Sequence, residues 1–288
     1  MAKKPIVCAF VSDPHIGSEL GICPPQGVTL SQGGKYTPGK IQRWLWRKAW
    51  VPYWRWIGDL VKRVDGHLRV VVNGDAMDSH AKGQIVSQVP GHLMYLGVES
   101  FRPIVEMQPG AVWFVQGTPS HTGGEAADLE EDLASRLHDA EKLAVQRNGH
   151  LWTWPEIDFD WYGTRVHVTH HGKVGGREHT LHSNAAGHAA DIANAYRARG
   201  YSPDHLWITA HRHTLADSGQ SLIDDMRYVV LPSFQAMTPY AHKVVSHRPA
   251  FLQDIGGLAG IFYPDERPYQ LLKFVVRPTR DGPDEIVK

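Results

Sequence analysis

The sequence predicts a layered α/β domain, in which strands and helices alternate early in the chain and strands cluster late. Two observations support this fold class. Short apolar, β-favouring runs recur along the chain, and several of them end directly in Asp or His. Between these runs lie segments whose apolar residues recur at helical spacing. With 288 residues and 42% hydrophobic content, the chain can bury a full core, so we expect residues 1–288 to form a single domain.

The strands are predicted from the apolar runs themselves. The first is the run from Ile6 to Val11, which ends in Ser-Asp-Pro-His. Comparable runs predict further strands at 68–72, 111–115, 161–169, 206–209, 228–231 and 271–276. We expect residues 214–288 to complete a second sheet.

Helices and one long loop account for most of the remaining chain. Residues 17–40 are rich in Gly, Pro, Ser and Gln, which predicts a long surface loop. A Trp-rich helical segment is expected at 41–64, with a kink or break at Pro52, and further helices at 125–145 and 184–199. The Trp-rich segment has two interpretations: a core helix, or a surface that stacks single-stranded bases while its Arg and Lys contact phosphates. The Trp spacing fits one helix face, which favours the core helix.

The composition limits the classes of partner. Thirty basic residues balance thirty acidic ones, so no global field attracts nucleic acid or an anionic membrane. The chain begins with only a short apolar run, which predicts neither a signal peptide nor a membrane span, and we expect a cytoplasmic protein with no membrane partner. Cys8 and Cys23 are not expected to form a disulfide in that setting. Eighteen His residues direct attention to metal-ligand spacing.

Asp or His residues follow five of the predicted strands. They are Asp13 and His15, Asp75 and Asp78, His121, His170 and His171, and His211 and His213. In a layered α/β fold such strand ends converge on one edge, so residues far apart in sequence share one pocket. Carboxylates and imidazoles suit divalent manganese, iron, zinc or nickel. The pattern therefore predicts a metal site.

The same motifs resemble the calcineurin-like metallophosphoesterase family. They are Asp13-Pro14-His15, Gly74-Asp75-Ala76-Met77-Asp78, a Gly-to-His segment ending at His121, a His-Gly pair, and Ala210-His211-Arg212-His213. The resemblance covers residues 13–213, and its ordered set is more specific than any single motif. It implies a four-layer α/β/β/α sandwich with a site for two divalent ions.

The resemblance also implies ligand roles. Asp13, His15 and His213 would hold one metal, Asp75 would bridge both ions, and His171 and His211 would hold the second. His170 is the alternative to His171, which is preferred because the family's ligand usually stands directly before glycine.

One motif departs from the family pattern. The family reads Gly-Asn-His where this chain reads Gly117-Thr118-Pro119-Ser120-His121, so the Asn that would bind the second metal is missing. A hydroxyl of Thr118 or Ser120 is the expected replacement, directly or through water. This variant resembles sequences of bacteriophage and related bacterial phosphoesterases.

The expected activity is hydrolysis of a phosphomonoester or phosphodiester by a water that two divalent ions activate. Manganese is the expected metal, with iron, zinc or nickel as alternatives. His121 would protonate the departing oxygen, and Asp78 would orient its ring. The expected partner is a phosphate-ester substrate. The alternatives are a nuclease of the same family acting on DNA, and a metal-binding scaffold with weak catalysis.

Overall fold

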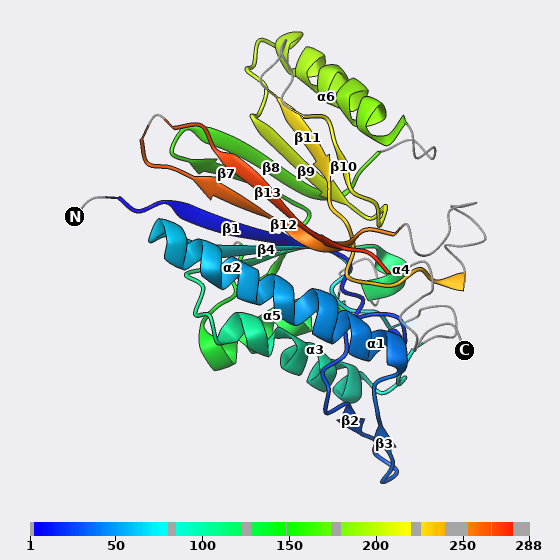
Figure 1. Ribbon diagram of the computed structural model, residues 1–288. Coiled ribbons are helices and arrows are strands. Elements are labelled where there is room, and N and C mark those ends of the chain that lie inside the picture. The colour runs from blue at the N-terminus through cyan, green and yellow to red at the C-terminus, as the bar shows by residue number, and fades with distance from the viewer. Residues whose placement is uncertain are drawn as a thin grey trace.

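The computed structural model describes residues 3–79, 85–122, 128–147, 149–173, 180–219, 226–239, 253–265 and 267–278. It is a mixed α/β protein built around two main sheets (Figure 1). The six-stranded sheet contains, in spatial order, β13 (Gln270–Val276), β12 (Ile255–Phe262), β1 (Ile6–Val11), β4 (His67–Asn73), β5 (Val112–Val115) and β6 (Thr153–Trp154). The five-stranded sheet contains β10 (Ala216–Asp217), β11 (Arg227–Val230), β9 (Leu206–Ala210), β8 (Thr164–His171) and β7 (Glu156–Trp161).

Strand direction places the site. In the first sheet β1, β4, β5 and β6 run parallel, and in the second β8, β9 and β11 run parallel. The strands β12, β13, β7 and β10 pair antiparallel with their neighbours. The carboxyl ends of the parallel strands in each sheet therefore lie at one edge, where polar loops can meet.

The helices cover the outer faces of the two sheets. They are α1 (Lys40–Trp44), the π-helix η1 (Leu45–Trp50), α2 (Val51–Val64), α3 (Pro90–Val105), α4 (Pro119–Thr122), α5 (Asp128–Glu141) and α6 (Leu181–Arg197). Helices α1, α2, α3 and α5 lie on the side of the six-stranded sheet, and α6 lies on the side of the five-stranded sheet (Figure 1).

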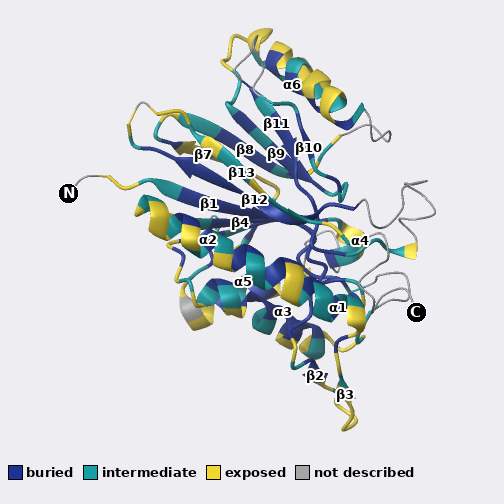
Figure 2. Ribbon diagram, viewed as in Figure 1, coloured by how far each residue is buried: buried dark blue, intermediate teal, exposed yellow. Residues whose placement is uncertain are grey.

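Apolar side chains fill the space between the two sheets. Phe10 and Val71 from the first sheet belong to the same buried cluster as Val168 and Ile208 from the second. A separate cluster joins α6 to its sheet through small residues such as Ala185 and Ala189. Figure 2 shows this pattern as buried strands beneath helices with exposed outer faces.

The Trp-rich segment is a core helix. Trp50 and Trp54 are buried, and Trp44, Trp46 and Trp56 are partly buried and pack against the same core. The Trp50 indole Nε1 donates a hydrogen bond of 2.8 Å to the Ser100 carbonyl. The core-helix interpretation is therefore confirmed for Trp50 and Trp54, whose rings are enclosed by the core.

The helical segment changes from π-helical to α-helical hydrogen bonding near Pro52 but continues without a break, since Trp50 and Val51 keep right-handed helical φ and ψ. Pro52 stands at the start of α2, where its missing N–H costs least, and the wider π-helical turns of η1 precede it. The long loop expected at 17–40 ends where α1 begins at Lys40. It contains a small hairpin of β2 (Val28–Thr29) and β3 (Lys35–Tyr36).

Two predictions about the remaining elements are corrected. The expected strand at 161–169 is two strands, because Tyr162 and Gly163 adopt positive φ and turn the chain between β7 and β8. Among the described residues after 213, β10 and β11 join the second sheet, whereas β12 and β13 extend the first.

The strand β12 and the helix α3 were not predicted. The sequence of β12, Ile-Gly-Gly-Leu-Ala-Gly-Ile-Phe, looks too rich in glycine for a strand. The structure supplies the reason: a Cβ at Gly257 would stand 2.7 Å from the Phe10 carbonyl oxygen. Helix α3 contains Pro103, which hides its pattern. Among the described residues, no helix is both long and apolar enough to cross a membrane.

Candidate metal centre

The strand ends bring the predicted site residues together. They follow or end β1 (Asp13 and His15), β4 (Asp75 and Asp78), β5 (His121, in α4), β8 (His170 and His171) and β9 (His211 and His213). Five of them have positive φ: Asp13, His15, Asp75, His211 and His213. Non-glycine residues rarely adopt this conformation, and such strain gathers at functional sites.

One group of donors consists of Asp13, His15 and His213. The His213 Nε2 atom lies 3.1 Å from Asp13 Oδ1 and 3.3 Å from His15 Nε2, and His15 Nε2 lies 3.7 Å from Asp13 Oδ1. The Asp13 and His15 side chains are buried. Asp13 Oδ1 has no hydrogen-bond partner among the described residues. Two of these groups come from the first sheet and one from the second.

Asp78 is buried behind this group and contacts two imidazoles. Its Oδ2 atom lies 3.1 Å from His15 Nδ1 and 3.4 Å from His121 Nδ1. By holding His15 Nδ1, Asp78 leaves Nε2 directed at Asp13 and His213, as an outer carboxylate does for a metal-ligating histidine. His121 is 30% exposed and packs edge-on against His15, with ring centroids 4.8 Å apart. The imidazole of His121 is therefore partly accessible from solvent.

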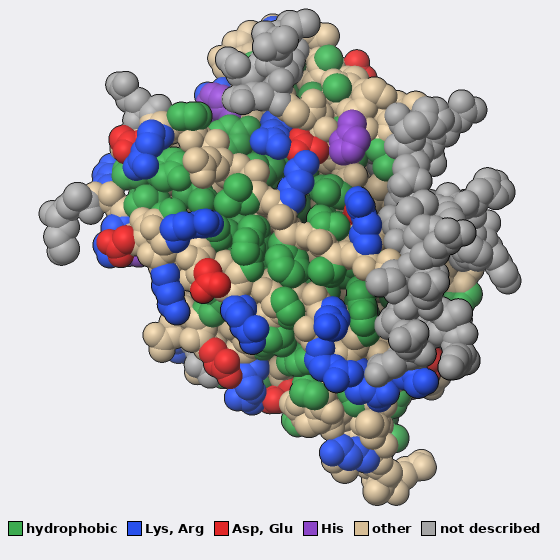
Figure 3. Space-filling view, in the orientation of Figure 1, with side chains coloured by type: hydrophobic (Ala, Val, Ile, Leu, Met, Phe, Trp, Pro, Cys, Tyr) green, Lys and Arg blue, Asp and Glu red, His purple; other side chains and the backbone are tan. Residues whose placement is uncertain are grey.

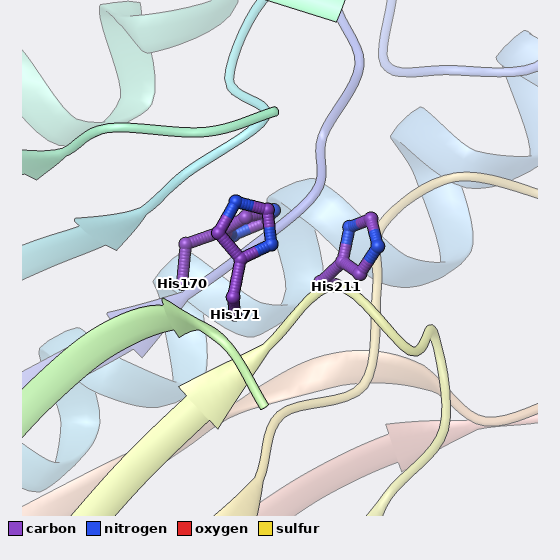
Figure 4. Close-up of side chains that lie close together, drawn as sticks. All are labelled: His170, His171 and His211. Carbon is purple, nitrogen blue, oxygen red and sulfur yellow. The ribbon is translucent and has the colours of Figure 1, made fainter. Parts of the chain in front are cut away.

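Asp75 lies between this group and a second cluster of imidazoles. Its Oδ2 atom lies 3.2 Å from His170 Nε2 and 3.9 Å from His211 Nδ1 and His15 Nε2. His170, His171 and His211 offer ring nitrogens within 4.8 Å of one another at the ends of β8 and β9 (Figure 4). Asp75 thus occupies the position between two donor groups that a bridging carboxylate requires.

His170 and His171 both belong to the second cluster. His170 is buried, its Nδ1 atom is hydrogen-bonded to the Asn73 carbonyl at 2.7 Å, and its Nε2 atom faces Asp75. His171 is more exposed. Consecutive residues of a regular strand point to opposite faces, but the register of β8 shifts between Val168 and His171. This irregularity brings both rings to the site.

Thr118 lies against Asp75 and His211. Its hydroxyl oxygen lies 3.1 Å from both Asp75 Oδ2 and His211 Nδ1, and its backbone N–H donates to Asp75 Oδ1. Ser120 is exposed on α4. Of the two hydroxyls, the structure places that of Thr118 against the second cluster.

Two glycines allow the loops to approach this closely. Gly74 has a φ of +76°, and a Cβ there would stand 2.3 Å from His170 Nδ1. At Gly117 a Cβ would stand 2.2 Å from the Asp75 backbone nitrogen. Any larger residue at either position would displace Asp75 or its neighbours.

Glu130 on α5 supports the site and was not predicted. This fully buried carboxylate accepts hydrogen bonds from the Ala76 N–H at 2.7 Å and the Gly117 N–H at 2.8 Å. It therefore ties the loop after β4 to the loop after β5. The sequence places it on an acidic helix, but Glu130 shares its face with the buried residues Leu133, Ala134 and Leu137. This shared helix face is the feature of the sequence that could have identified Glu130 as buried.

The electrostatics of the site favour bound positive charge. Burial alone would raise the pKa of Asp13 and Asp75, but the neighbouring imidazoles, led by His213 and His170 respectively, hold both well below the usual range. Burial alone would lower the pKa of His15, yet its bonds to Asp13 and Asp78 raise it to about 10. Against the same effect of burial, Asp75 raises the pKa of His170 to about 9. Protons on imidazoles thus compensate the carboxylates, a role that cations can also fill.

The donor set fits divalent metal ions. Two ligand atoms of one tetrahedral ion stand roughly 3.3 Å apart when each bond is about 2.0 Å, close to the spacing of the atoms of Asp13, His15 and His213. Asp13 Oδ1 has no hydrogen bond of acceptable geometry, and the Nε2 atoms of His15 and His213 face each other beside it, an arrangement that a cation would satisfy. Several Asp and His groups of this site can therefore bind metal.

No protein family model matches the chain, and no curated protein matches it. Among solved structures, the chain is similar to the sulfate thiohydrolase SoxB of Thermus thermophilus in complex with glycerol. The identity is 12% and the TM-score is 0.38, and the match covers 96% of this chain and 57% of that one. The chain spans little more than half the length of that structure.

Proposed function

We propose that this protein is a metal-dependent phosphoesterase of the calcineurin-like type. The observation that carries the proposal is the position of Asp75 between the group of Asp13, His15 and His213 and the group of His170, His171 and His211. In the proposal, the two sheets and their outer helices form the four-layer α/β/β/α sandwich of that family. We also propose that the chain is a bacteriophage-type member of that family, because Gly117-Thr118-Pro119-Ser120-His121 replaces the family's Gly-Asn-His.

The proposed ligands are those that the motifs predict, with His170 added. Asp13, His15 and His213 hold one divalent ion, Asp75 bridges, and His171 and His211 hold the second with His170 against the bridging carboxylate. Manganese is the proposed ion, with iron, zinc or nickel as alternatives. Bound in pairs, such ions acidify a water molecule and withdraw charge from the phosphoryl oxygens.

The remaining roles fall to the chain's own residues. His121 is partly exposed beside His15 and donates a proton to the oxygen that leaves phosphorus. Asp78 orients the His121 ring through Nδ1. Burial alone would raise the pKa of Asp78, but its bonds to His121 and His15 keep it low, so Asp78 is ionised near neutral pH. The substrate class is a phosphomonoester or phosphodiester.

The test is a parallel assay of an aryl phosphate monoester, an aryl phosphate diester, a nucleotide and single-stranded DNA with several divalent metals. We expect manganese-stimulated cleavage that Asp75→Asn abolishes and that His121→Ala reduces by about 100-fold or more. Metal analysis that finds no ion, together with an Asp75→Asn variant of unchanged activity, would contradict the proposal.

The assay also separates the alternatives. Cleavage of DNA alone would identify a nuclease; Trp50 and Trp54 are buried in the core and would not be available to stack its bases. Lys and Arg are dispersed among apolar atoms over the face that carries α2, with a few acidic residues between them (Figure 3). Metal binding without turnover on any substrate would identify a scaffold. We also propose a cytoplasmic location, which cell fractionation can test.

A further inference from the structure

A buried tyrosine on β11 holds the chain where it leaves the second imidazole cluster. Tyr228 is 3% exposed and lies on the strand that pairs with β9. Its hydroxyl oxygen accepts a hydrogen bond of 3.0 Å from the Lys173 N–H and donates one of 3.1 Å to the Lys173 carbonyl. One side chain therefore binds both backbone groups of the residue that stands two places after His171.

The same hydroxyl contacts the strand that leads to His211. Thr209 of β9 is buried, and its Oγ1 atom donates a hydrogen bond of 3.3 Å to the Tyr228 oxygen. A phenol donates one hydrogen bond and can accept others, so all three contacts are compatible. Burial raises the pKa of Tyr228 above its ordinary value, so the hydroxyl keeps the proton that it donates. Tyr228 thus connects the chain after His171 with the chain before His211.

Gly172 lets the chain after β8 lie this close. A Cβ at Gly172 would stand 2.2 Å from Thr209 Oγ1 and 3.2 Å from the Tyr228 hydroxyl oxygen. The pairing of β8 with β9 ends at His171 and Ala210. The hydrogen bonds of Tyr228 therefore fix the chain directly beyond the last paired residues of the two strands.

The two imidazoles nearest these bonds are the more accessible ones of the cluster. His171 is exposed and the His211 side chain is 36% exposed, and their ring centroids lie 4.9 Å apart at the ends of adjacent strands (Figure 4). His170, in contrast, is buried and hydrogen-bonded to the Asn73 carbonyl. An exposed side chain has few packing contacts, so the position of its ring depends mainly on the backbone that carries it.

We propose that Tyr228 is a positioning residue for the second metal ion, because its bonds to Lys173 and Thr209 set the separation of His171 and His211. The inference rests on the proposed function, in which these two imidazoles hold that ion. Groups that orient metal ligands without touching the metal change its affinity by roughly 10–100-fold when they are removed. The second ion is also the one for which the family's Asn is missing, so its binding depends more strongly on the remaining donors.

The variant Tyr228→Phe removes only the phenol oxygen and tests this role. In calorimetric titration of the metal-free full-length protein, we expect one of two manganese ions to bind about tenfold more weakly and the other to bind as in wild type. Hydrogen exchange at the Lys173 amide should become about tenfold faster. The matched control is Tyr196→Phe, which removes a phenol of α6 that donates to Asp204 Oδ2 at 2.9 Å. This control should keep both manganese affinities.

The outcomes separate this inference from the proposed function. A role in folding alone predicts that Tyr228→Phe lowers the unfolding free energy in urea but keeps both manganese affinities. That result, or an unchanged exchange rate at Lys173, would overturn the positioning role and leave the hydrolytic proposal intact. A wild type that binds two ions without cleaving a phosphate ester would contradict hydrolysis alone, since the titration still decides the role of Tyr228. A wild type that binds fewer than two ions would contradict both.

Discussion

Gly117 permits a very close approach to Asp75 in the candidate metal centre, and replacing it with alanine should damage the site severely. The added Cβ would stand 2.2 Å from the Asp75 backbone nitrogen and 2.3 Å from Asp75 Oδ1. Ordinary contact begins at 3.4 Å, so one of the two loops must move by about 1.2 Å. Neither contact atom is the free end of a flexible side chain, and Glu130 ties both loops together.

The size of the effect follows from this displacement. A misplacement of about 1 Å in a catalytic arrangement costs roughly 100-fold in rate. Overpacking in a buried region costs about 1–3 kcal/mol of unfolding free energy. We therefore expect Gly117→Ala to lower kcat for an aryl phosphate by about two orders of magnitude, to weaken metal binding, and to leave a folded but less stable protein.

The assay measures kcat at saturating manganese, metal affinity by calorimetry and unfolding by urea. Gly187→Ala is the matched control: Gly187 lies within α6 with no atom within 4 Å of the added Cβ. This control should gain about 0.5–1 kcal/mol of stability and keep its activity. If Gly117→Ala instead kept metal affinity and kcat within threefold of wild type, the proposed position of Asp75 in the centre would be refuted.

Three further predictions test the site and the core. Thr118→Val should weaken the binding of one of two metal ions about tenfold, because it removes the hydroxyl beside Asp75. Ser120→Ala, at an exposed position, should leave metal binding unchanged. Metal titration measures the affinity of both variants. Trp50→Ala should lower the unfolding free energy by about 3–5 kcal/mol in urea, because it empties a fully buried position. Burial, followed by the charge of Asp75, raises the pKa of Glu130 from 4.5 to about 7, so the folded state holds this proton at pH values where the unfolded state releases it. As the pH rises from 4.5 through 7, the unfolding free energy of the chelator-treated wild type should therefore fall. This fall should be about 3 kcal/mol larger than the fall for Glu130→Gln. Urea denaturation of both proteins at each pH measures the difference.

The sequence predicted β1, β4, β5, β9, β11 and β13 because each contains a short, mainly apolar run, and it predicted the segment that contains β8 because its apolar residues alternate. The prediction failed where packing overrides local preference. Gly257 is required in β12 because the Phe10 carbonyl lies too close for a side chain, yet glycine in a sequence argues against a strand. The sheet to which β12 and β13 belong depends on contacts distant in sequence, which periodicity does not report.

The site could be predicted down to its donor residues but not to the role of each. From the order of the motifs, Asp75 and His211 were expected at one edge of the sheets, and the structure places them there. The choice between His170 and His171 depends on a register irregularity in β8 that no local pattern encodes. Glu130 was missed because a helix that is acidic overall conceals one carboxylate on its buried face. The ligand assignments themselves stay predictions until metal binding is measured.

The candidate centre draws its donors from both sheets, and this has a consequence for stability. Asp13 and His15 belong to the six-stranded sheet, whereas His213 belongs to the five-stranded sheet, and Asp75 likewise faces His170 across the interface. An ion bound by such a group joins the two sheets. Because the donors come together only in the folded protein, the ion binds the folded protein more tightly than the unfolded chain. Metal should therefore raise the unfolding free energy by about 2.7 kcal/mol for each site at a concentration 100 times its dissociation constant. Because the same interface is filled by residues such as Phe10 and Val168, a core substitution there should weaken metal binding without touching a ligand.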